Sequence, residues 1–145
     1  MNNNQNITQI INYKNKTILI SYDEFPDNPR NWDNLGTIIS WNTKYSIGDK
    51  TVLLDEHDEE TVTKVMQNAI TENDVVCIFS LYIYEHGGIV LSLKPFECQW
   101  DSGQIGFIYC TTDSLEKMGC EDFTKEKIKK ALEQEIETYN KYLNG

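Results

Sequence analysis

The sequence has no long apolar run and no secretory leader, and both absences narrow the class of protein. No stretch approaches the roughly 18 consecutive apolar residues that a membrane-spanning helix needs. The segment from Met1 to Asn6 has neither a charged region nor an apolar one, so it does not resemble a signal peptide. We therefore expect a soluble, cytoplasmic protein without a membrane partner.

Cysteine pairs, histidine and glycine-rich motifs are also scarce. The four cysteines, Cys77, Cys98, Cys110 and Cys120, form no CxxC pair, which argues against a zinc ribbon or a thioredoxin-type site. Without a secretory leader, free thiols are the expected state. The sequence also lacks GxxxxGK[ST] and GxGxxG, so nothing indicates a nucleotide, and we predict no cofactor and no bound metal.

Basic residues are few, and Arg30 is the only arginine. Thirteen Lys and Arg face 23 Asp and Glu, giving a net charge of −10. Residues 55–120 carry three basic and twelve acidic residues, so most of the acidity lies in the middle of the chain. A chain this acidic repels phosphate backbones, and we expect no direct binding to nucleic acid.

What is present suits one folded domain. The 145 residues are 39% apolar and 11% aromatic, which is enough to bury a core. We therefore predict a single domain over residues 1–145. Its Asn-rich first 16 residues are expected to be loosely ordered.

Short β-branched and aromatic runs separated by turn residues predict a mostly antiparallel sheet. The predicted strands are Thr17–Tyr22, Gly36–Trp41, Thr51–Leu54, Val75–Tyr84, Ile89–Leu93 and Gln104–Thr111. Gly87 and Gly88 allow positive φ angles, so they predict a hairpin between the two strands they separate. Strands joined by hairpins, with helices set apart, indicate an α+β fold.

Two or three helices are predicted, the last of them C-terminal. Asp58 is the expected N-cap of the first, followed by the apolar stripe Val62, Val65, Met66, Ala69 and Ile70. A short helix is expected to begin at Asp113 and to end at Gly119. Thr124 is the expected N-cap of the last, whose stripe is Ile128, Leu132, Ile136, Tyr139 and Leu143.

Two loops each place a Trp-Asp pair shortly before a strand. The first contains Trp32, Asp33 and Asn34, and the second contains Trp100, Asp101 and Ser102. The structural interpretation is that each indole plugs one end of the core while the Asp caps a turn. The functional one is that these six residues anchor a partner, because a loop Trp is unfavourable in water.

These loops and the hairpin between them carry a resemblance to a known family. The segments are Trp32–Thr37 (WDNLGT), Tyr82–Gly88 (YIYEHGG) and Pro95–Tyr109 (PFECQWDSGQIGFIY). They resemble a family of small uncharacterised proteins encoded by bacteriophages and mobile elements, with the likeness spanning about residues 17–120. The resemblance supplies no catalytic residues. It implies a bacterial host cell and an accessory protein that binds and inhibits a host factor, as anti-CRISPR and anti-restriction proteins do.

The acidic run before the first helix allows a related hypothesis. Glu56, Glu59 and Glu60 belong to a cluster that suits the positive end of a helix dipole, and the simplest interpretation is a helix start and solubility. The alternative is that these carboxylates imitate nucleic acid toward a basic channel on a host enzyme. A third possibility is an accessory subunit that binds another phage protein.

An enzyme is the competing class, with a Cys/His hydrolase or transferase as its concrete form. Cys98 is the candidate nucleophile, His86 its base, and Asp101 or Asp33 the orienting acid. No helix follows Cys98 to lower its pKa, and its surroundings match no cysteine-protease signature. The same Asp33, Asp101 and His86 could ligate a metal, although no spacing motif demands one.

Overall fold

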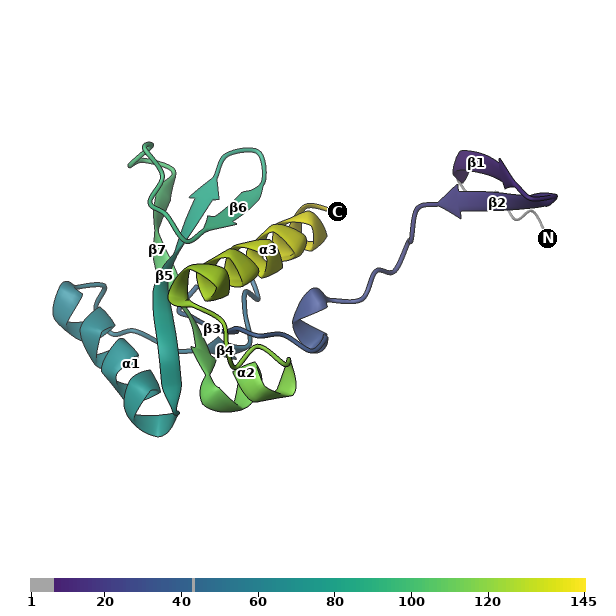
Figure 1. Ribbon diagram of the computed structural model, residues 1–145. Helices are drawn as coiled ribbons and strands as arrows, with labels where there is room; N and C mark the ends of the chain where they lie inside the picture. Colours follow the sequence, from purple (N-terminus) through teal and green to yellow (C-terminus); the bar gives the residue numbers. More distant parts are fainter. Residues whose placement is uncertain (1–6, 43) are drawn as a thin grey trace.

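The computed structural model describes residues 7–42 and 44–145, which form an α+β fold with two separate β-sheets (Figure 1). The smaller sheet is a hairpin of β1 (Ile7–Tyr13) and β2 (Lys16–Ser21). A short 3-10 turn, η1 (Pro29–Asn31), then leads into the larger part, and we call residues 29–145 the body. The predicted fold class is confirmed.

The body is built on a five-stranded sheet in the order β4-β3-β7-β5-β6. Its strands are β3 (Thr37–Ser40), β4 (Lys50–Thr51), β5 (Val75–Glu85), β6 (Ile89–Ser92) and β7 (Ser102–Thr111). All neighbours are antiparallel except β3 and β4. Gly87 adopts a φ of 70° in the predicted β5–β6 hairpin. The prediction of a strand at Thr51–Leu54 is wrong in extent, because β4 ends at Thr51.

Helix α3 (Lys125–Asn144) covers one face of this sheet, and the main core lies between them. Four residues of its predicted apolar stripe are buried, with Leu132 and Tyr139 fully inaccessible to solvent, and the fifth, Leu143, is half-buried. The predicted N-cap is also confirmed, since the Thr124 hydroxyl accepts a hydrogen bond from the Lys127 amide. Against it pack alternate residues of the central strands, among them Leu81 and Ile108.

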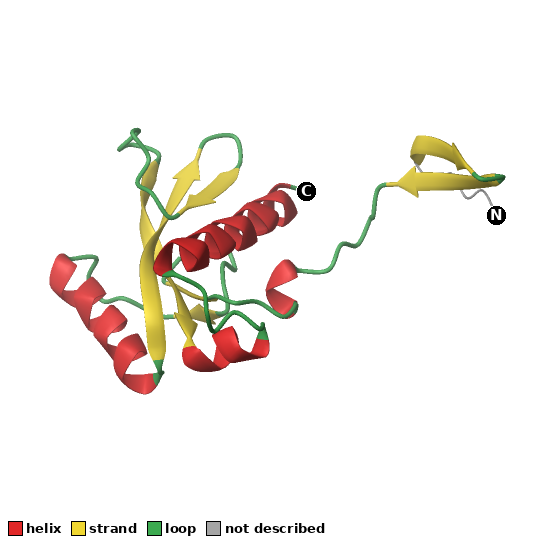
Figure 2. Cartoon of the chain, viewed as in Figure 1, coloured by secondary structure: helices red, strands yellow, loops and turns green. Residues whose placement is uncertain are grey.

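Helix α1 (Glu59–Glu72) covers only part of the opposite face, and Figure 2 shows helices on both sides of the strands. Asp58 caps it as predicted, accepting from the Thr61 amide at 2.8 Å. Ala69 is the one buried residue of its stripe, packing with Ile39 and Tyr109, whereas Ile70 is 43% exposed. The helix therefore leaves the other end of this sheet face without a helix over it.

The short helix α2 (Thr112–Lys117) begins earlier than predicted. Its N-cap is Thr111, which forms a reciprocal capping box with Ser114, so the expected start at Asp113 is wrong. Thr111 caps the helix in place of Asp113 because Thr111 is the last residue of β7. Its backbone is therefore extended, which is the conformation an N-cap needs. Gly119 follows at a φ of 67°, as a helix stop requires.

Within the 16 residues expected to be loosely ordered, Ile7–Tyr13 forms β1, while residues 1–6 lie outside the described ranges. The tight turn into β2 is made by Lys14 and Asn15, whose φ angles are 45° and 61°. Left-handed angles at both central positions match the twist of a two-residue hairpin. The sequence offered no Asn-Gly or Asp-Gly pair here, so the usual signal for this turn was missing.

Candidate functional site

The loop that carries Trp100 is held in place by its neighbours while the indole itself points into solvent. The Phe96 ring packs on Tyr84 with centroids 5.5 Å apart, and the Glu85 amide donates to the Asp101 carbonyl at 2.8 Å. The Ser102 hydroxyl donates to the Cys98 carbonyl and closes the loop on itself. Trp100 is nevertheless 96% exposed. An ordered loop thus presents a large aromatic side chain to a partner.

Trp32 is also exposed, at 54%, so the interpretation that the two indoles plug the ends of the core is wrong. The tryptophan that does fill the core is Trp41, which is 7% exposed and meets Phe107 edge to face at 5.8 Å. In the first loop, Asn34 donates its side-chain amide to the carbonyls of Pro29 and Trp32. Asn34 therefore shapes the turn, and Trp32 remains available.

The two Trp-Asp loops lie at opposite ends of the sheet. Thr37, which follows the first loop, pairs with Tyr109 near the end of β7. The second loop leads into Ser102, the first residue of the same strand. About seven residues of strand separate these positions, which corresponds to about 23 Å. The loops therefore cannot form one composite site on a single copy of the chain.

Of the enzyme candidates, the structure brings two together. The His86 Nδ1 lies 3.4 Å from the Asp101 Oδ2, at the tip of the β5–β6 hairpin, and both side chains are well exposed. Cys98 meets neither of them in any hydrogen bond of the described residues, and Asp33 belongs to the loop at the other end. The arrangement gives a surface His-Asp pair without an adjoining nucleophile.

Two of the other cysteines lie in the core. All four thiols are free, as predicted. Cys110 and Cys77 are buried between the sheet and α3, and burial raises the pKa of the Cys110 thiol to about 11. Cys110 therefore stays protonated at neutral pH, which removes its nucleophilic form.

The acidic residues singled out in the sequence cluster at the start of α1. Glu56, Glu59 and Glu60 are all exposed, and Glu60 pairs with Lys64 one turn along the helix at 2.9 Å. They surround the Asp58 N-cap, where negative charge is favourable. The start of α1 therefore presents negative charge on an exposed surface.

One polar cluster was missed by the sequence reasoning, and it centres on the single arginine. The Arg30 guanidinium forms two bonds to Asp49, at 2.5 and 3.2 Å, and a third to the Gly36 carbonyl at 2.7 Å. Glu135 of α3 approaches from the other side, 3.7 Å from Arg30, and accepts from the amides of Leu35 and Gly36. Burial raises the pKa of Glu135, although these donors oppose the shift. The cluster fastens the η1 segment to α3.

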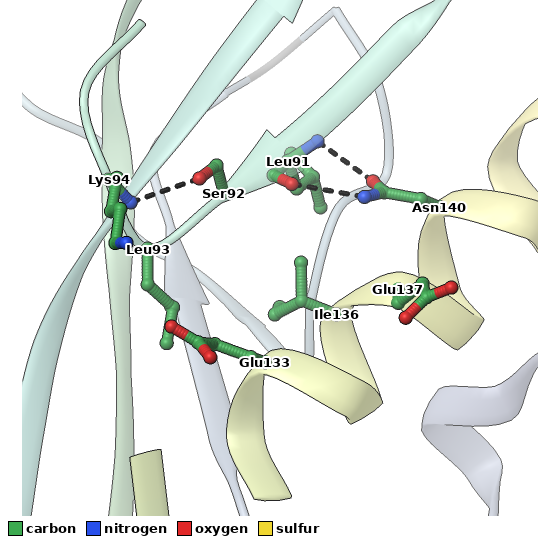
Figure 3. Close-up of a pocket in the computed structure, with 8 residues that line it drawn as sticks. All are labelled: Leu91, Ser92, Leu93, Lys94, Glu133, Ile136, Glu137 and Asn140. Carbon is green, nitrogen blue, oxygen red and sulfur yellow. Dashed lines mark hydrogen bonds between the residues drawn. The ribbon is translucent and has the colours of Figure 1, made fainter. Parts of the chain in front are cut away.

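A groove lies between β6 and α3, and Figure 3 shows the side chains that line it. Asn140 accepts from the Leu91 amide at 2.8 Å and donates to its carbonyl at 3.0 Å. One turn later Asn144 repeats both bonds with Ile89. The two amides thereby occupy the outward backbone groups of the edge strand, as another strand would.

Comparisons with known proteins do not assign the chain to a family. No protein-family model, curated protein or solved structure matches this chain. In residues 7–42 and 44–145, no helix has the length and apolar character to cross a membrane, and no three His, Cys, Asp or Glu side chains converge as a metal site would require. The resemblance to phage proteins therefore stays a prediction.

Proposed function

We propose that this chain is a phage-type accessory protein that binds a host protein through the Trp100 loop and inhibits it. The observation that carries the proposal is the 96% exposure of Trp100 on a loop ordered by hydrogen bonds and aromatic packing. Tryptophans are among the commonest anchors of protein interfaces, and desolvating one contributes much of the binding free energy.

The charge around this loop favours a basic partner. Glu97 and Asp101 flank Trp100 in the sequence, and residues 29–145 contain 11 basic and 20 acidic residues, a net charge of −9. Enzymes that act on nucleic acid present basic channels, and an acidic surface is steered toward them. This supports a defence nuclease or restriction enzyme as the target class, with Trp100 as the anchor.

The acidic cluster at Glu56, Glu59 and Glu60 serves as a supplementary electrostatic surface in this proposal. The cluster is exposed and lies at the start of α1. Trp32, Asp33 and Asn34 form a second candidate contact, and the register of β7 prevents it from sharing one small epitope with Trp100.

The test is affinity capture from host lysate with Trp100→Ala and a matched Trp32→Ala variant, each at low and high salt. The proposal expects a nucleic-acid enzyme to be captured and inhibited by the unmodified chain, to be held less tightly by Trp32→Ala at the second candidate contact, and to be lost with Trp100→Ala. If the unmodified chain still captures the enzyme at high salt, the indole is the main anchor. If high salt abolishes the capture, the carboxylates are the main anchor. Full capture and inhibition by Trp100→Ala would refute the proposal.

A different outcome would redirect the assignment. Co-purification with a phage protein from infected cells, in place of a host enzyme, would indicate an accessory subunit. The His86–Asp101 pair is the observation that keeps a hydrolase or transferase in view as the second candidate. That function requires a reactive Cys98 thiolate, so the absence of alkylation of Cys98 at neutral pH would eliminate it.

A further inference from the structure

The hairpin of β1 and β2, which we call the arm (Ile7–Ser21), projects away from the body (Figure 1). None of its residues belongs to either core cluster. Its large apolar side chains are 37–60% exposed, and they are Ile7, Ile10, Ile11, Tyr13, Ile18, Leu19 and Ile20. An isolated two-stranded hairpin is only marginally stable in water, so this arm needs a surface to cover it.

The two faces of the arm differ. The register pairs Ile11 with Ile18 and places Tyr13 and Ile20 on the same face, so four apolar side chains line it together with Gln9 and Lys16. The opposite face carries the Ile10–Leu19 pair together with Thr17, whose hydroxyl donates to Asn12. The first face is the one suited to packing against an apolar partner.

The body has a sheet patch of matching kind. Leu81 and Ile83 of β5 point into the core under α3, so Tyr82 and Tyr84 point to the opposite face. The register sets Val90 beside Tyr84, and neither tyrosine nor Val90 belongs to a core cluster. The Phe96 ring packs on Tyr84 and borders the patch there. Val90 is 42% exposed. Helix α1 covers only the other end of this face, where it meets Ile39, Tyr109 and Ile78.

The arm can pack on the face of the five-stranded sheet, but it cannot extend this sheet by pairing with an edge strand. Asn140 and Asn144 already occupy the outer backbone groups of β6, and β4 at the other edge has two residues. Two sheets packed face to face are a stable arrangement with their strands about 30° apart. The hairpin therefore fits over Tyr82 and Val90 as a second layer, beside the Phe96 ring that covers Tyr84.

Charge indicates which kind of surface the arm packs against. Lys14 and Lys16 are the charged side chains of the arm, which contains no acidic residue, whereas residues 29–145 carry 11 basic and 20 acidic residues, a net charge of −9. An acidic surface attracts this arm, and Asp101 lies at the end of the patch, beside the His86 ring that packs on Tyr84. Anionic lipids and nucleic acid would attract the arm but repel the body, so they fit less well.

Geometry favours the patch of a second copy over the arm's own. The linker enters the body at η1, which Arg30 and Glu135 fasten to α3, and α3 lies on the face of the sheet opposite to the patch. Residues 22–28 between arm and body span at most about 25 Å. The arm would have to wrap around its own body to reach the patch, whereas a neighbouring copy can present its patch directly.

We propose that two copies exchange arms, each arm laying its Ile11–Ile18 face on the Tyr82–Val90 patch of the other copy. Such an exchange is self-complementary, so one two-fold axis creates both contacts and closes the assembly as a dimer. The inference does not depend on the proposed function.

The test measures molecular mass against concentration by analytical ultracentrifugation of the full chain at two salt concentrations. Ile18→Glu damages the packing face of the arm, and Leu19→Glu is the matched control, since the neighbouring side chain is equally large and 54% exposed on the opposite face. Val90→Glu damages the patch. We expect a dimer that high salt weakens, at least about tenfold weaker association with Ile18→Glu and Val90→Glu, and little change with Leu19→Glu.

Mixing the two damaging variants decides between arm-on-patch and arm-on-arm contacts. The Ile18→Glu chain retains an intact patch and the Val90→Glu chain retains an intact arm, so the mixture should form a heterodimer through one of the two contacts. A monomer at every concentration, an equal effect of Leu19→Glu, or no heterodimer in the mixture would overturn the proposal. So would co-sedimentation of the unmodified chain with phosphatidylserine vesicles without dimerisation.

Discussion

Replacing Arg30 by methionine tests whether the single arginine holds the η1 segment on the body. The Arg30 side chain is 4% exposed, and Asp49 and Glu135 beside it are 24% and 16% exposed. Removing the guanidinium leaves two partly desolvated carboxylates facing each other without a cation. Breaking a buried ion pair in this way costs about 3–5 kcal/mol. Both carboxylates keep backbone amide donors, so we expect the lower end, a loss of about 3 kcal/mol in the free energy of unfolding.

The assay is urea unfolding followed by tryptophan fluorescence, with the midpoint and slope fitted separately. Arg30→Lys keeps the charge but loses the planar fork that bonds Asp49 twice, so its stability should lie between those of the Arg30→Met variant and the unmodified chain. Lys64→Met, which removes an exposed pair with Glu60, is the control and should change little. A loss below about 1 kcal/mol for Arg30→Met would refute the argument, since it would equal an exposed pair.

Two further predictions concern α3. Burial raises the pKa of Glu135 above its ordinary 4.5, so the folded state binds its proton more tightly, and its contribution to stability is greatest below pH 4.5 and falls as the pH rises through the folded pKa. The unfolding free energy of the unmodified chain relative to Glu135→Gln should therefore decline with pH over that window, and a difference independent of pH would contradict it. Asn140→Ala removes both bonds to Leu91 and should lower the free energy of unfolding by about 1–2 kcal/mol in urea. Asn144→Ala, whose bonds are exposed, should cost less, and equal losses would show that the closed edge is not the cause.

Local sequence signals predicted the elements well where a pattern spans several residues. The α3 stripe, its Thr124 cap, the Asp58 cap and the Gly87 turn follow from periodicity and capping chemistry that neighbouring residues alone supply. The start of α2 was mispredicted because two adjacent segments, each with capping residues, competed. β1 was missed because its turn uses Lys14 and Asn15 in a conformation that their residue types only weakly favour.

The candidate site was only partly predictable. The sequence singled out Trp100 and Trp32 correctly as unusual loop residues, but not that both are exposed while Trp41 is buried. Whether an indole is covered depends on which strands lie beside it, and that is a long-range property. The pairing of His86 with Asp101 and the Asn140 bonds to Leu91 likewise join residues far apart in the chain.

The sequence by itself determined the acidic charge, the free thiols expected without cysteine pairs, and the α+β class, because composition and short-range periodicity set these. Only the tertiary structure decided that the two Trp-Asp loops lie at opposite ends of β7 and that Arg30 joins Asp49 to Glu135. It also decided that an apolar arm stands clear of the body. Strand register and helix placement set these features, and both arise from contacts between distant residues that no local window of sequence contains.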